Sequence, residues 1–224
     1  MKNIKALLKL DFELIKPYWM WLLMFLGIAI VLTLVTVNQN NSAISFIISL
    51  IMFAGTFICF PFESTDNSNL NVLYASLPTN RKSIIVARYI SILIILATSL
   101  IVAVVGSILM DLAFSNPLSF SFIATFTCIA FALYMFNVGF QTPFMYRFGY
   151  VKGKIFIWIP IIIVMAIMFI PDLLGAFDVI VNFNIFNILL QNPLVTSLVS
   201  LGAGIIFITV SFFISRAIYL KKDF

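Results

Sequence analysis

The chain has 224 residues, of which 63% are hydrophobic and only 9% are charged. A soluble domain carries about 25% charged residues, so this composition excludes a soluble protein and predicts a chain that lies mostly in lipid. The net charge is +5 and no histidine occurs, which excludes histidine metal sites, histidine-activated nucleophiles and histidine proton relays. No P-loop motif occurs either, so we expect no ATP binding or catalysis by this chain alone.

Residues 1–17 predict an amphipathic helix that lies in the headgroup layer. One side of this helix is apolar at helical spacing, and the other side carries four lysines and a glutamate. A basic amphipathic helix next to a membrane span typically lies in the interface. The apolar side consists of Ile4, Leu7, Leu8, Phe12 and Ile15.

Residues 18–224 predict one all-α transmembrane domain with six membrane-spanning helices. The expected spans are Tyr18–Val37, Ala43–Phe62, Tyr89–Met110, Ser121–Phe140, Ile155–Ile170 and Val195–Tyr219. All 13 basic residues fall in the two termini and in the second–third and fourth–fifth connections. The positive-inside rule therefore predicts that both termini are cytoplasmic, in a multi-pass protein of the plasma membrane. The positive charge reports topology and calls for no nucleic-acid partner.

The predicted spans carry hydroxyls, an amide and aromatic rings near their middles, but no acid or base. Ion-coupled carriers and intramembrane aspartyl proteases normally need acids at that depth, so both classes are disfavoured. The two cysteines, Cys59 and Cys128, lie in apolar runs and are expected to be reduced packing residues. We therefore expect no catalytic, cofactor-binding or metal-binding residues in this chain.

Two connections carry more information than plain loops. The basic-side connection 63–88 contains helix-capping residues before a short helical segment, 69–77, which Pro78 ends. A short helix at the cytoplasmic surface suits docking to a soluble partner, and a solvated basic link is the alternative. The opposite connection, 171–193, is too apolar for a solvated loop, so we expect it in the outer interface or dipping into the bilayer.

These features resemble the permease subunits of ABC-2 type exporters, in the six-span branch with a separate ATPase. The resemblance covers nearly the whole chain and rests on the basic first helix, the block SLPTNR at 76–81 and the segment FGYVKGK at 148–154. Within this branch the chain is most similar to membrane subunits of phenol-soluble modulin exporters of Gram-positive bacteria. Permeases that protect against bacitracin or lantibiotics share the same layout.

The resemblance implies a dimer, with a second copy or a paralogue, bound to two P-loop ATPase subunits that hold the ATP and Mg²⁺. The interfacial helix is implied to touch the ATPase. The ATPase-coupling residues are implied to be Asn69, Leu73, Tyr74, Leu77, Pro78, Arg81 and Lys82. The outer gate is implied to contain Leu173, Leu174, Phe177, Ile180, Phe183, Ile185 and Phe186.

The function predicted from these features is ATP-driven export of amphipathic peptides similar to phenol-soluble modulins. The uncharged interior of the predicted spans suits such cargo, taken laterally from the inner leaflet. Self-protection against antibiotic peptides such as bacitracin or lantibiotics is an alternative with the same fold. A membrane interaction or assembly protein without transport is an alternative of another class, and the absence of an adjacent ATPase gene would favour it.

Overall fold

The computed structural model describes residues 2–36, 42–67, 81–114, 120–163 and 192–221, and these residues are helical almost throughout. Apolar side chains dominate them, so the backbone groups satisfy one another within helices, as a lipid environment requires. In chain order the elements are α1 (Lys2–Ile15), η1 (Lys16–Tyr18), α2 (Trp19–Thr36), α3 (Ser42–Ala54), η3 (Gly55–Ile58), α4 (Cys59–Asn67), α6 (Arg81–Phe114), α7 (Phe120–Gly153), a helix over 155–163, and α11 (Pro193–Leu220).

The prediction of an all-α membrane protein is confirmed. Four helical stretches in the described residues are long and apolar enough to cross a membrane: Phe46–Ser64, Lys82–Met110, Phe120–Gly153 and Pro193–Leu220. A fifth candidate joins Lys5–Tyr18 to Leu23–Val31 across a bend of 61°. The predicted fifth span, 155–170, lies partly outside the described residues, of which 155–163 are helical. The count of six spans stays a prediction.

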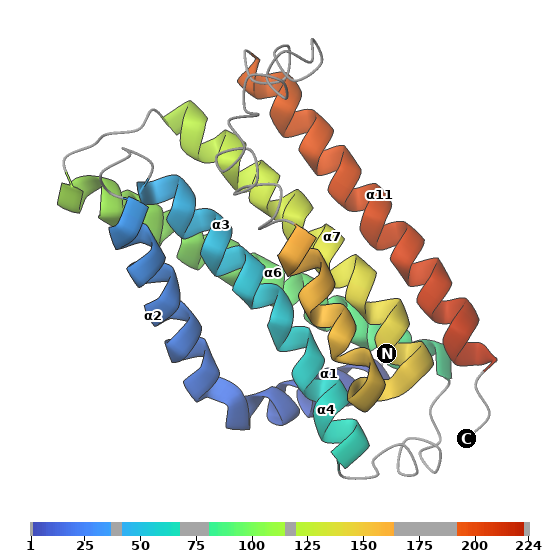
Figure 1. Cartoon of the computed structure of the whole chain (residues 1–224). Coiled ribbons are helices and arrows are strands. Elements are labelled where there is room, and N and C mark those ends of the chain that lie inside the picture. The colour runs from blue at the N-terminus through green and yellow to red at the C-terminus, as the bar shows by residue number, and fades with distance from the viewer. Residues whose placement is uncertain (1, 37–41, 68–80, 115–119, 164–191, 222–224) are drawn as a thin grey trace.

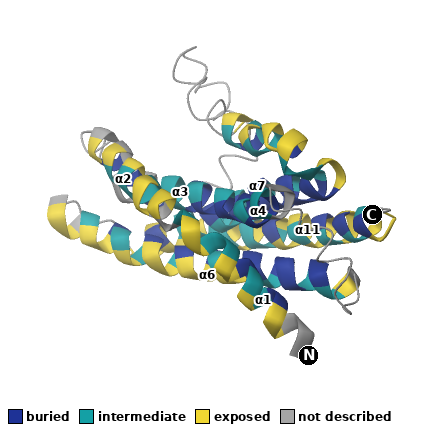
Figure 2. Cartoon of the chain, turned by 90° about the horizontal axis from the view of Figure 1, so that it is seen from below, coloured by how far each residue is buried: buried dark blue, intermediate teal, exposed yellow. Residues whose placement is uncertain are grey.

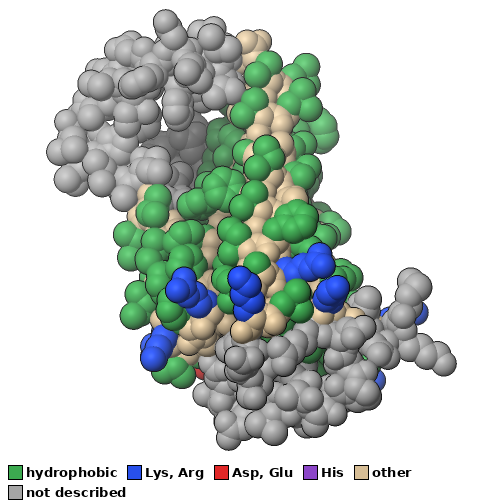
Figure 3. Space-filling model, turned by 90° about the vertical axis from the view of Figure 1, so that its right-hand side faces the viewer, with side chains coloured by type: hydrophobic (Ala, Val, Ile, Leu, Met, Phe, Trp, Pro, Cys, Tyr) green, Lys and Arg blue, Asp and Glu red, His purple; other side chains and the backbone are tan. Residues whose placement is uncertain are grey.

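Successive long helices run in alternating directions between two ends of the bundle, and α1 lies across one of these ends (Figure 1). We call this the basic end, because α1, the start of α6 and the ends of α7 and α11 meet there. Figure 3 shows the Lys and Arg side chains gathered toward this end. The basic residues whose side chains the structure describes are Lys5, Lys9, Lys16, Lys82, Arg88, Arg147, Lys152, Lys154, Arg216 and Lys221.

The core forms where α3 packs against α6 and α7, and where α7 packs along α11. Burial is concentrated there, whereas the outer face of α6 is exposed (Figure 2). Gly204 makes the α7–α11 packing close, because a β-carbon there would lie 2.7 Å from the Phe131 ring. The small residue thus lets the two helices approach closely.

Two helices extend beyond the spans expected from hydropathy. α6 begins at Arg81, two turns before the expected start at Tyr89. α7 continues past the expected end at Phe140, through Pro143, and reverses at Gly149. Gly149 has φ 73° and ψ 177°, a backbone conformation that a residue with a β-carbon rarely adopts, and the helix over 155–163 then runs back (Figure 1).

Candidate functional site

The first helix packs onto the basic end of the bundle. α1 contacts α6 and α4 through its predicted apolar side. Leu7 is buried, Leu8 is half-buried and Phe12 is 39% exposed, while the Ile4 side chain is outside the described set. The amphipathic pattern therefore docks α1 against the spans, with Lys5 and Lys9 left exposed.

A buried ion pair joins α1 to α6. Arg88 Nη2 lies 3.4 Å from Asp11 Oδ1, and both side chains are only 5% exposed. The Ser91 hydroxyl donates to Asp11 Oδ2 at 3.1 Å, so both carboxylate oxygens of Asp11 have a partner on α6. Removing one partner of a buried ion pair typically costs about 3–5 kcal/mol, because the other charge stays buried. This pair therefore fixes α1 on the first turns of α6.

Aromatic and hydroxyl contacts extend the ion pair to the other helices of the basic end. The Arg88 guanidinium lies 4.6 Å from the centroid of the Phe62 ring on α4, a cation–π geometry. Phe62 packs edge-on against Tyr146 of α7 at 5.1 Å, and Tyr146 packs against Tyr219 of α11 at 5.1 Å. Tyr89 Oη hydrogen-bonds Ser211 Oγ at 2.7 Å and Ser215 Oγ at 2.9 Å on α11.

Five helices thus meet in one buried cluster, which we call the basic-end network. It lies between the end of α4 and the first turns of α6, the two elements that flank residues 68–80 in the chain. Its residues are Asp11, Phe62, Arg88, Tyr89, Ser91, Tyr146, Ser211, Ser215 and Tyr219.

A second polar cluster, the amide cluster, lies farther from the basic end along α7 and is uncharged. Gln141 accepts from the Cys59 thiol at 3.4 Å and donates to the Asn137 side-chain oxygen. Asn137 in turn donates to the Met52 carbonyl at 3.4 Å. Gly55 makes room for it, since a β-carbon there would lie 2.7 Å from Asn137 Nδ2. Cys59 is free and buried, as predicted, and all these groups are neutral.

The structure places two of the predicted ATPase-coupling residues. Arg81 begins α6, and Lys82 follows it with an exposed side chain. The other coupling residues (Asn69, Leu73, Tyr74, Leu77, Pro78) and the seven predicted gate residues between 173 and 186 lie outside the described residues. Within the residues that are described, no group of three acidic, cysteine or histidine side chains could hold a metal ion.

Sequence reasoning missed the pairing of Asp11 with Arg88. In the sequence, Arg88 counts only among the basic residues of the connection 63–88. The signal was nonetheless present, because Asp11 falls among Leu7, Leu8 and Ile15 on the apolar side of α1. A lone acid on a buried stripe requires a cationic partner, and Arg88 supplies it.

Comparisons with known proteins identify one family. A family model described as "ABC-2 family transporter protein" matches residues 6–220. Neither the comparison with curated proteins nor the comparison with solved structures gives a match. The resemblance to ABC-2 permeases is therefore confirmed, and the similarity to phenol-soluble modulin exporters stays a prediction.

Proposed function

The chain belongs to the ABC-2 transporter family, whose members are membrane permease components of ABC transporters, and we propose that it exports amphipathic peptides. In this proposal it forms a dimer, with a second copy or a paralogue. The dimer binds two ABC ATPase subunits, which hold the ATP and Mg²⁺. In the same proposal the chain has six spans, and both termini and the basic end face the cytoplasm, as the positive-inside rule predicts.

The observation that carries the proposal is the position of the basic-end network. α4 ends at Asn67 and α6 begins at Arg81, so both flanks of the connection 68–80 start from the basic end. Phe62 before the connection and Arg88 after it contact each other at 4.6 Å. Asp11 then ties this contact to α1. A force applied to the connection would therefore reach α1, α4 and α6 together.

This arrangement supports an ATPase-docking role for the connection and for the start of α6. ATP-driven closure of the ATPase dimer would push on Asn69, Leu73, Tyr74, Leu77 and Pro78, with Arg81 and Lys82 at the edge of the contact. The apolar side of α1 (Ile4, Leu7, Leu8, Phe12) would move with them. On the other side of the membrane, residues 173–186 would serve as the outer gate.

The choice of amphipathic cargo is supported by where charge lies in the bundle. The buried ion pair is at the basic end, whereas the amide cluster of Asn137 and Gln141 is neutral. A neutral interior imposes a small desolvation cost on apolar cargo and a large one on ions. Amphipathic peptides of the phenol-soluble modulin type fit this interior, and they reach it from the inner leaflet.

The proposal is tested in proteoliposomes that contain the chain and its cognate ABC ATPase, identified by co-purification from the native host. We expect ATP hydrolysis only when both subunits are present, and its stimulation by amphipathic helical peptides similar to phenol-soluble modulins. Stimulation by bacitracin or a lantibiotic instead would assign the self-protection function. Failure to co-purify with any ATPase would refute the transport role.

A further inference from the structure

An apolar cavity of about 270 Å³ opens between α1, α2, α3 and α6. Two of its lining residues, Thr98 and Ser99, carry hydroxyl groups. These groups donate to carbonyls of their own helix, Thr98 to Ile94 at 3.1 Å and Ser99 to Leu96 at 2.9 Å. The wall therefore offers apolar surface, and an apolar cavity of this kind binds apolar ligands.

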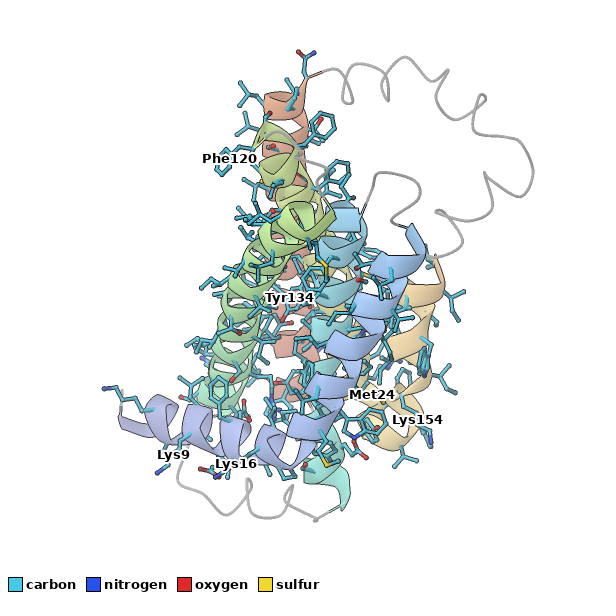
Figure 4. The ribbon with its side chains drawn as sticks, turned by 90° about the vertical axis from the view of Figure 1, so that its left-hand side faces the viewer. Lys9, Lys16, Met24, Phe120, Tyr134 and Lys154 are labelled. Atoms are coloured by element: carbon cyan, nitrogen blue, oxygen red, sulfur yellow. The ribbon has the colours of Figure 1, made fainter. Side chains whose placement is uncertain are left out.

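Aromatic contacts hold one side of the cavity in shape. Phe25 of α2 stacks on Phe53 of α3 at 5.0 Å and meets the edge of Phe57 of η3 at 5.8 Å. All three rings line the cavity, together with Phe12 and Ile15 of α1. Because α1 lies across the basic end (Figure 4) and its Phe12 and Ile15 line the cavity, the cavity reaches the depth of α1.

Positive charge stands beside the cavity at that depth. Lys9 of α1 precedes Phe12 by three residues and Lys16 of η1 follows it by four, so both lysines lie next to Phe12, where the basic side of the helix borders its apolar side. Both are exposed, and Lys16 lies 3.9 Å from Glu13. Figure 4 shows Lys9 and Lys16 along α1 at the basic end. Lysines at this depth reach anionic headgroups while their stems cover apolar surface.

We propose that the cavity binds one acyl chain of an anionic phospholipid from the basic-side leaflet, whose headgroup the α1 lysines hold. The apolar wall favours the acyl chain, and the lysines favour an anionic headgroup. This inference goes beyond peptide export, because it assigns a lipid site that helps to fix α1 on the bundle.

The test uses the full chain, delipidated in detergent, and native mass spectrometry with added phosphatidylglycerol or phosphatidylcholine of the same acyl chains. Val102 lines the cavity on α6, and Val105 lies on the same helix, is 53% exposed and is not among the lining residues. We expect Val102→Trp to fill the cavity and lose most of the retained phosphatidylglycerol. Val105→Trp, the matched control, should retain as much as the wild type.

A second set of variants tests the contribution of the lipid headgroup separately from that of the acyl chain. One lysine near an anionic surface is worth about a fivefold change in affinity. Lys9→Gln and Lys16→Gln together should therefore lower the preference for phosphatidylglycerol over phosphatidylcholine by at least that factor, without loss of phosphatidylcholine. If Val102→Trp fails to fold, Leu50→Trp fills the cavity from α3.

Three results would overturn the proposal. The first is equal lipid retention by the Val102→Trp and Val105→Trp variants. The second is an unchanged lipid preference after both lysine substitutions. The third is a cavity-filling variant that still retains phospholipid but no longer binds an amphipathic peptide. That result would assign the cavity to cargo.

Discussion

The two buried polar clusters of the bundle differ in charge and in depth. The basic-end network contains the ion pair of Asp11 and Arg88, close to where α1 lies across the bundle. The amide cluster, centred on Asn137 and Gln141, lies deeper along α7 and contains only neutral groups. Charge becomes costlier with depth in a bilayer, so the protein keeps full charges near the interface and uses amides deeper. The basic-end network is therefore a charged junction that ties five helices together, whereas the amide cluster is neutral packing within the bundle.

Removing one charge from the basic-end network gives the largest expected effect. Asp11→Ala leaves Arg88 buried without its ion partner and should destabilise the protein by about 3–5 kcal/mol. Thermal unfolding in detergent measures this loss. Glu13→Ala, on the exposed side of the same helix, is the matched control and should change stability by less than about 0.5 kcal/mol. The reversed pair, Asp11→Arg with Arg88→Asp, should recover part of the loss; no recovery would contradict an ionic interaction.

Crowding the amide cluster gives a smaller effect. Gly55→Ala places a β-carbon 2.7 Å from Asn137 Nδ2 and forces the amide to move. We expect a loss of about 1–3 kcal/mol, typical of overpacking, in the same unfolding assay. Gly202→Ala is the control, because a β-carbon there meets nothing within 4 Å. Equal stability of the two variants would show that the close packing around Asn137 is not required.

Removing one neutral hydrogen-bonding group gives the smallest effect. Tyr89→Phe keeps the ring but loses the hydrogen bonds to Ser211 and Ser215. Hydrogen bonds between membrane helices contribute about 0.6 kcal/mol on average, so the temperature of unfolding in detergent should fall only slightly. A loss as large as that of Asp11→Ala would contradict the distinction between charged and neutral contacts in the basic-end network.

The fold was predictable from hydropathy because a bilayer allows few ways to satisfy the backbone. Helix ends were less predictable. Gln141 and Thr142 have the polarity of a span end, yet Gln141 is satisfied by Cys59 and Asn137, so α7 continues. Arg81 and Lys82 are too polar for a span, yet they extend α6 toward the basic end.

The site was only partly predictable. The apolar side of α1 followed from helical spacing, and its burial at Leu7 agrees with that pattern. The partner of Asp11 did not follow, because a contact between α1 and α6 depends on tertiary packing rather than on local spacing. Asp11 on the apolar side of α1 indicated that a cationic partner was needed, but the sequence offered no way to choose Arg88 among the basic residues.

The central claim is that the basic end docks an ABC ATPase, and cross-linking from the two ends of one helix tests it most directly. Lys82 and Ala113 are both exposed, near opposite ends of α6. In a background carrying Cys59→Ser and Cys128→Ala, Lys82→Cys should cross-link to the co-purified ATPase in membranes. Ala113→Cys should not. Cross-linking from Ala113→Cys, with none from Lys82→Cys, would contradict the account.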